Sequence, residues 1–318
     1  MASSSTASSP VIPARPRFWI ELGYGFAAIG AVLFSTKGIA IKLAYREPID
    51  ATLLLALRMA LAVPFYAVIG WLALRDRRRR GQPRPSVELL GRAAFVGILG
   101  YWVASYLDFY GLEFISAQFE RLILFTYPLF VVIFGALFFR QPMKLSAVAA
   151  IGLSYLGLAV IFVENIGEPG SHVAWGTFVV LISALAFAMY QLLAKKVIAE
   201  LGPQLFTCVA MGAAAVLVFV QFILTRPLSE ISAVSPHVWW ISVYLAIGAT
   251  VLPSFFMSAA LHRISAQANS AIATLSPVMT IVLAVAILGE PLTVTGVIGA
   301  LLVLASVGWF TLIDRRGR

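Results

Sequence analysis

The chain has 318 residues, of which 61% are hydrophobic and 12% are charged, and its mean hydropathy is +0.94. Soluble globular proteins are about half apolar and about a quarter charged, so this composition excludes an ordinary soluble domain and indicates a protein embedded in a bilayer. The formal net charge of +9 is compatible with nucleic-acid binding. However, the basic run at 75–80 (RDRRRR) directly follows an apolar segment, as in a cytoplasmic loop of a membrane protein. We therefore expect a lipid bilayer, and no nucleic acid, as a partner.

Residues 1–17 are polar and rich in Ser and Pro, and predict a disordered cytoplasmic tail. The apolar run that follows is longer than the core of a cleaved signal peptide, so we interpret it as the first transmembrane helix. A span needs about 20 mostly apolar residues, and further segments along the chain meet this requirement. The ten predicted spans are 18–43, 50–74, 89–111, 115–139, 143–163, 173–199, 204–225, 237–261, 266–288 and 292–313.

Basic residues are distributed unequally over the predicted loops. With a cytoplasmic N-terminus, most Lys and Arg residues fall on the cytoplasmic side, whereas the opposite side has only Lys42, Arg46 and Arg226. The positive-inside rule then predicts that both termini are cytoplasmic, which requires an even number of helices.

The two halves of the chain share a pattern at an offset of 149 residues. The segment 115–118 (ISAQ) is identical to 264–267, and Pro128 matches Pro277 at the same offset. Coincidence is the alternative, because apolar segments match easily, but we interpret the pattern as a duplication. Each repeat then has five helices, an odd number, so the second repeat enters the membrane inverted. Inverted repeats are typical of transporters, whose binding site lies near the bilayer midplane.

We therefore expect an all-α membrane protein with ten transmembrane helices arranged as two inverted five-helix repeats. The first repeat would comprise residues 18–163 and the second 173–313.

The two matching stretches, 115–152 and 264–300, resemble the EamA-type, ten-helix branch of the drug/metabolite transporter superfamily. In that family each half has a proline within a helix and a Gly-Glu-Pro-Leu-Thr-like turn before its last helix. Residues 289–293 (GEPLT) fit this turn, while 140–144 (RQPMK) depart from it. Within the superfamily, 119–130 (FERLILFTYPLF) resembles the bacterial exporters of aromatic amino acids.

The resemblance implies a secondary transporter of the bacterial inner membrane that exports small amphipathic metabolites, in particular aromatic amino acids, by alternating access. The alternatives are a multidrug or other-metabolite exporter of the same fold, a channel, or a membrane-embedded enzyme.

Ionisable residues inside the spans are the first candidates for function, because a charge at the bilayer centre costs about 2.5–3.5 kcal/mol on insertion scales. The predicted topology puts all of them in the outer part of the membrane, in the first four helices. They form either an outer gate or substrate-charge site, or a fixed set of ion pairs that includes snorkelling side chains. These residues are Lys37, Arg58, Asp108, Glu120 and Arg121.

Aromatic and polar side chains gather in the third and sixth spans, where an aromatic ligand could stack on them. Tyr101 and Ser105 share a helix face by their i, i+4 spacing. Ordinary packing, or an aromatic belt at the membrane interface, is the alternative. Lys37 or Arg121 would attract a substrate carboxylate, and Gln191 would add a hydrogen bond. The residues predicted to bind substrate are Lys37, Tyr101, Trp102, Ser105, Tyr106, Tyr190 and Gln191.

Pro128 and Pro277 occupy matching places in two helices, and each removes one backbone hydrogen bond and kinks its helix. We predict that they act as hinges, with a static bend as the alternative. The chain has no phosphate-binding Gly-x-x-x-x-Gly-Lys-Ser/Thr loop, and His172, His237 and His262 have no metal-ligand spacing. We therefore predict no cofactor, no metal and no enzymatic activity. The partner would be a small-molecule substrate; protons as a second partner, and the choice between monomer and homodimer, stay open.

Overall fold

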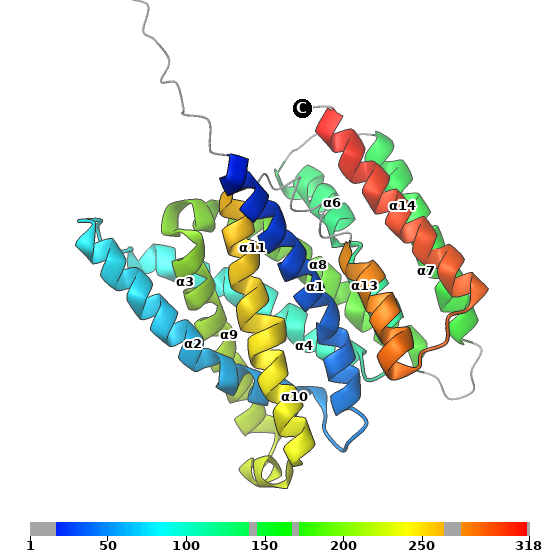
Figure 1. The fold of residues 1–318 in the computed structure, drawn as a ribbon, viewed down its shortest axis with the longest axis horizontal. Coiled ribbons are helices and arrows are strands. Elements are labelled where there is room, and N and C mark those ends of the chain that lie inside the picture. The colour runs from blue at the N-terminus through cyan, green and yellow to red at the C-terminus, as the bar shows by residue number, and fades with distance from the viewer. Residues whose placement is uncertain (1–16, 140–144, 167–171, 264–274, 317–318) are drawn as a thin grey trace, which may run out of the picture.

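The computed structural model describes residues 17–139, 145–166, 172–263 and 275–316. Every regular element within these ranges is helical (Figure 1). Of the predicted tail, only Arg17 belongs to the described part, and it already begins the first helix. The elements are α1 (Arg17–Ala44), α2 (Ala51–Arg79), α3 (Val87–Gly97), η1 (Ile98–Val103), α4 (Ala104–Gly111), α5 (Ala117–Leu124), α6 (Tyr127–Phe139), α7 (Leu145–Ile166), α8 (Val173–Leu201), α9 (Pro203–Thr225), η2 (Leu228–Ala233), α10 (Pro236–Ala246), η3 (Ile247–Val251), α11 (Leu252–Arg263), α13 (Leu275–Leu283), η4 (Ala284–Leu288) and α14 (Val294–Arg316).

Among the described residues, seven helical segments are long and apolar enough to cross a bilayer, and they correspond to the first four predicted spans and to the sixth, seventh and eighth. Shorter apolar helices, Gly152–Val163, Ser276–Leu288 and Val294–Ser306, occupy the positions of the fifth, ninth and tenth spans. The predicted fold class, an all-α membrane protein with ten transmembrane helices, is thereby confirmed.

The packing of the helices is symmetric between the two repeats. The first helix of one repeat, α1, packs against α11, and its counterpart α8 packs against α4, which is the counterpart of α11. The second helices of the repeats, α2 and α9, pack against each other, and so do the last ones, α7 and α14, at one edge of the bundle (Figure 1). This exchange of partners is expected for two inverted repeats related by a pseudo-two-fold axis in the membrane plane.

The offset of 149 residues also relates local features of the backbone. Ser86 caps α3 with its side chain, and Ser235 caps α10 in the same way. The π-helical segment η1 begins at Ile98, and the π-helical segment η3 begins at Ile247. A π-helical turn is a local widening of an α-helix that is frequent at functional sites. The duplication therefore extends well beyond the stretches in which identical residues indicate it.

Three predictions about individual helices need correction or refinement. The predicted spans 89–111 and 237–261 are both present, and each contains a π-helical segment, η1 or η3, between two α-helical parts. The face assigned to Tyr101 and Ser105 by α-helical spacing crosses the end of η1, so that spacing does not hold there. The span 115–139 is divided into α5 and α6, with Pro128 in the first turn of α6, so the helix is interrupted next to this proline, and the kink itself stays a prediction.

Pro277 likewise lies near the start of α13, and the residues preceding that helix are outside the described part. The role of Pro128 and Pro277 as hinges stays a prediction.

Close approach of α3 to α9 requires a glycine at position 97. A Cβ atom at Gly97 would lie 2.3 Å from Ala210 Cα, so a side chain there forces the two backbones apart. We expect Gly97→Ala to lower the free energy of unfolding by about 1–3 kcal/mol, measured as a lower thermal unfolding temperature in detergent. Gly91→Ala, in the same helix but with nothing within 4 Å of the added Cβ, is the control and should be neutral or slightly stabilising. Equal losses in both variants would contradict the close approach.

Candidate functional site

The five ionisable residues predicted inside the spans lie together, near the end of the bundle at which α1 ends and α2 begins. We call this end the outer end, after the topology predicted from the basic residues. Lys37 lies on α1, Arg58 on α2, Asp108 on α4, and Glu120 and Arg121 on α5. All are buried except Lys37, whose side chain is 14% exposed. We refer to these five residues as the ionisable cluster.

Direct contacts join three helices within the ionisable cluster. Lys37 Nζ on α1 forms an ion pair with Asp108 Oδ2 on α4. The carboxyl group of Glu120 on α5 lies within hydrogen-bonding reach of that of Asp108. Arg121 Nη2 donates a hydrogen bond to the carbonyl oxygen of Phe34, at 2.8 Å, and so ties α5 back to α1. The cluster therefore holds α1, α4 and α5 together at the outer end.

Arg58 is the least compensated cation of the cluster. Its guanidinium carbon lies 4.8 Å from the centre of the Phe109 ring, a cation–π contact. Its Nε and Nη2 atoms reach no acceptor in the described part of the chain, although the residue is only 3% exposed. A buried charged group with unsatisfied donors is energetically costly. Arg58 is therefore suited to bind an anionic group.

Tyr101 of η1 and Tyr190 of α8, two of the residues predicted to bind substrate, are in contact. Their hydroxyl oxygens lie 2.8 Å apart in a hydrogen bond, and their ring centroids are 5.1 Å apart in an edge-to-face arrangement. Gly100 makes this possible, because a Cβ atom at this position would lie 2.3 Å from the Tyr190 ring.

Tyr66 of α2 links this tyrosine pair to the ionisable cluster. It lies near enough to Tyr101 and Arg58 to interact with both electrostatically, and its hydroxyl lies 3.1 Å from Ser254 Oγ. Sequence reasoning missed Tyr66, although a polar hydroxyl inside an apolar span was a usable signal.

The other predicted aromatic residues have different partners. Trp102 Nε1 donates a hydrogen bond to Gln221 Oε1 of α9, at 2.8 Å. Tyr106 stacks on Tyr110, with ring centroids 6.0 Å apart and nearly parallel planes.

Ser105 and Gln191 are partly exposed, and within the described residues neither side chain forms a hydrogen bond. The structure thus brings Tyr101 and Tyr190 together but divides the rest of the predicted set. Gln221 was not predicted as a site residue, although its amide within an apolar span is unusual.

A second set of contacts at the outer end joins the two repeats. Gly289 adopts a left-handed conformation with φ of 71° and ends η4, and Glu290 follows it. The Glu290 carboxylate accepts hydrogen bonds from the backbone amides of Ala117, at 2.8 Å, and Gln118, at 3.2 Å. An anion at the N-terminus of a helix is favourable, so Glu290 of the second repeat caps α5 of the first.

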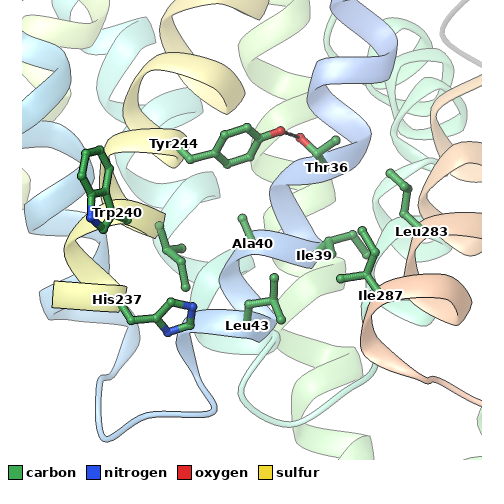
Figure 2. Close-up of a pocket in the computed structure, with 10 residues that line it drawn as sticks. Thr36, Ile39, Ala40, Leu43, His237, Trp240, Tyr244, Leu283 and Ile287 are labelled. Carbon is green, nitrogen blue, oxygen red and sulfur yellow. Dashed lines mark hydrogen bonds between the residues drawn. The ribbon is translucent and has the colours of Figure 1, made fainter. Parts of the chain in front are cut away.

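Two cavities lie in the outer half of the bundle. A groove of about 370 Å³ runs between α1, α10 and the helix formed by α13 and η4. In it, apolar side chains of α1 face Leu283 and Ile287, and the Tyr244 hydroxyl bonds to Thr36 Oγ1 at 2.6 Å (Figure 2). The other cavity, of about 650 Å³, is lined by charged residues that include Asp50 and Arg226. Neither of these two cavities is lined by any of the residues predicted to bind substrate.

Comparison with known proteins identifies the family. Residues 21–163 and residues 174–312 both match the sequence model described as the EamA-like transporter family. The chain belongs to the EamA-like transporter family. The two matches correspond to the two inverted repeats, and the resemblance inferred from the sequence is confirmed at the level of this family. The protein is therefore a multi-pass membrane transporter of small molecules.

Two bacterial transporters are similar to this EamA-like transporter over most of their length. The uncharacterized transporter YcbK of Bacillus subtilis is 29% identical over 280 residues, which cover 86% of this chain and 88% of that protein. An uncharacterized transporter of Clostridium kluyveri is 23% identical over 295 residues, covering 90% of this chain and 91% of that protein. One crystal structure aligns with a TM-score of 0.62 at 18% identity, covering 92% of this chain and 98% of that chain. This last likeness supports the fold alone.

The outer end of this EamA-like transporter also contains a pH-dependent contact. Hydrogen bonds with Ser235, and then with His237, whose Nδ1 lies 2.6 Å from Glu47 Oε1, hold the pKa of Glu47 below its ordinary value of 4.5. A carboxyl group with a lowered pKa in the folded state stabilises the protein above its unfolded pKa and loses this contribution as the pH falls through the folded pKa.

We expect Glu47→Gln to lower the thermal unfolding temperature at pH 7 and to match the wild type only once the pH has fallen below the lowered pKa of Glu47, where the carboxyl group is protonated in the folded protein as well. Unfolding in detergent, followed across this pH range for both proteins, is the measurement. A difference between the two proteins that is the same at every pH would show that the charge of Glu47 has no part in the contact.

Proposed function

We propose that this EamA-like transporter is a secondary carrier that exports small amphipathic metabolites, with aromatic amino acids as its favoured substrates, by alternating access. The observation that carries this proposal is the pairing of a buried guanidinium, Arg58, with nearby aromatic rings. Arg58 has two N–H groups without an acceptor in the described residues. A carboxylate is the natural bidentate partner of such a group, and tyrosine rings are natural neighbours for an aromatic side chain.

The contacts of the cluster favour Arg58 over the two cations that sequence analysis assigned to the substrate carboxylate. Lys37 is already paired with Asp108, and one nitrogen of Arg121 is bound to a backbone carbonyl. In our proposal Arg58 binds the carboxylate, and Lys37 and Arg121 contribute positive potential around it.

Tyr101 and Tyr190 would flank the substrate ring, since they are near Tyr66 and thereby near Arg58. In the proposal the other predicted residues, Trp102, Ser105, Tyr106 and Gln191, complete the wall of the pocket. Because Arg58 and Tyr190 are buried, substrate would reach them in conformations that open the centre of the bundle.

We propose that the two repeats, 18–163 and 173–313, move relative to each other during transport, with Pro128 and Pro277 as hinges. The division of the fourth span into α5 and α6 next to Pro128 supports a hinge in the first repeat. We further propose a bacterial inner-membrane location with both termini cytoplasmic. The start of α1 and the end of α14 lie at the same end of the bundle (Figure 1), which supports an even number of crossings.

The test is uptake of radiolabelled tryptophan and phenylalanine into proteoliposomes that contain the purified protein, with unlabelled amino acids as competitors. We expect saturable uptake that aromatic amino acids inhibit. Arg58→Gln, Tyr101→Ala and Tyr190→Ala should each raise the half-saturating concentration by about tenfold or more, equivalent to about 1.4 kcal/mol of binding free energy. Tyr24→Ala is the matched control, because Tyr24 is 46% exposed on α1.

The other outcomes discriminate between functions. Saturable transport of other metabolites or drugs, without aromatic amino acids, would keep the carrier and reject this substrate class. Flux that does not saturate would indicate a channel, and a chemically altered product would indicate an enzyme. If all three pocket variants transported as the wild type does, the proposed pocket would be wrong.

A further inference from the structure

Three buried carboxyl oxygens of the ionisable cluster are left without donors. Asp108 is 2% exposed and Glu120 is fully buried. Lys37 binds Oδ2 of Asp108, whereas Asp108 Oδ1 and both oxygens of Glu120 receive no hydrogen bond from any N–H or O–H group of the described residues. Buried carboxylate oxygens are nearly always satisfied by donors, and leaving them unsatisfied is costly.

A proton bound between Asp108 and Glu120 would supply a donor to these unsatisfied oxygens. The two carboxyl groups are within hydrogen-bonding reach of each other. Ionised carboxylates only accept hydrogen bonds, so a bond between two carboxyl groups requires that one of them carry a proton. Two carboxyl groups that share a buried site do not both ionise readily, because their like charges repel.

We propose that Asp108 and Glu120 form a proton-binding site, sharing one proton in this conformation, and that this site couples export to the proton gradient. This inference rests on the proposed transport function and adds the coupling ion to it. Four titratable groups interact with the pair: Lys37 of α1, Arg58 of α2, Arg121 of α5, and Tyr45, which directly follows α1.

Glu290 adds a negative charge near the start of α5, where its carboxylate binds the amides of Ala117 and Gln118. The charged residues of α8 are Lys195, Lys196 and Glu200, which lie toward the end of that helix opposite to its contact with α4 at Gly176. The segment α13 has no charged residue. With one shared proton the cluster holds three cations and one anion, and release of the proton adds a second anion.

The position of Glu120 connects proton binding to helix movement. A Cβ atom at Gly38 of α1 would lie 3.3 Å from Glu120 Oε2, so the carboxyl group is packed closely against α1. When the proton leaves, repulsion between the two carboxylates drives α5 away from α4, and α5 is the short helix that ends just before Pro128. In export by exchange with protons, the outward-open carrier would take up a proton on the pair, close at the outer end and release the proton on the cytoplasmic side.

The experiment uses phosphatidylethanolamine and phosphatidylglycerol vesicles with the full-length protein, and two transport assays. Counterflow exchange of labelled for unlabelled phenylalanine, without a gradient, reports transport alone. Accumulation driven by an imposed pH gradient, with an internal pH dye, reports coupling. We expect Glu120→Gln to abolish gradient-driven accumulation and substrate-induced proton movement, with exchange still measurable. Glu88→Gln removes an exposed carboxylate and should leave both assays as in the wild type.

The outcomes separate the two proposals. If the wild type shows no counterflow with aromatic amino acids, the proposed substrate is wrong whatever Glu120 does. If the wild type exchanges phenylalanine but a pH gradient drives no accumulation, or if Glu120→Gln remains fully coupled, the proton site is refuted and the carrier function stands.

An infrared measurement covers the case in which the variant does not fold. We expect the wild type at neutral pH to show the carbonyl band of a buried, protonated carboxyl group that exchanges slowly with D₂O. Absence of this band would overturn the shared proton without any variant.

Discussion

Replacing Lys37 by Met should destabilise the protein by about 3–5 kcal/mol, because the substitution leaves Asp108 as a buried carboxylate without its cation. Asp108 is 2% exposed and pairs with Lys37 through Oδ2. Chemical or thermal unfolding in detergent measures the loss. The double variant Lys37→Met/Asp108→Leu removes both charges and should recover most of the stability, since replacing a buried ion pair by apolar residues is often neutral.

The ion pair of Arg92 with Glu88 is the matched control for this prediction. Both of its side chains are more than half exposed, and exposed pairs contribute about 0–1 kcal/mol. Arg92→Met should therefore change stability little. If Lys37→Met were as mild as Arg92→Met, the pair at the outer end would not be a buried ion pair in the membrane protein.

The second large effect is expected at Glu290. Its carboxylate accepts hydrogen bonds from two successive amides at the start of α5, and hydrogen bonds to charged groups contribute about 1.5–3 kcal/mol. We expect Glu290→Ala to lower the free energy of unfolding by about 2–3 kcal/mol and to speed amide hydrogen exchange locally in the peptide that contains α5. Glu290→Gln keeps an acceptor and should lose about half as much.

Hydrogen exchange distinguishes this cap from a general loss of stability. Faster exchange confined to α5 and its neighbours supports a contact between the repeats at this point. Uniformly faster exchange across all helices would instead indicate global destabilisation, and unchanged exchange in α5 would mean that Glu290 does not cap it.

The architecture was predictable from the sequence because its determinants are local. Apolar runs of membrane-spanning length indicate the helices, and the matching residues at Pro128 and Pro277 reveal the duplication. The break between α5 and α6 was also predictable, since proline removes a backbone hydrogen bond wherever it occurs in a helix. The π-helical turns were not, because one extra residue in a helix leaves hydropathy unchanged.

The candidate site was predictable only in part, for a different reason. Charged residues stand out in apolar spans, so the ionisable cluster was identified, but the partner of each charge depends on contacts between distant helices. The pairing of Trp102 with Gln221, the cap from Glu290 to Ala117, and the unsatisfied donors of Arg58 all arise from tertiary packing. Spacing along one helix contains no information about them.

The π-helical turn η1 fixes the direction in which Asp108 points. Each residue advances an α-helix by about 100°, so deleting one residue from this turn would rotate α4 and carry Asp108 away from Lys37 and Glu120. The turn η3 occupies the same register of the second repeat, although the residue at the position of Asp108 there is Met257, which packs near Gly30 of α1. The same wide turn therefore occurs at one register in both copies, whereas the acidic residue whose direction it fixes in the first copy is absent from the second.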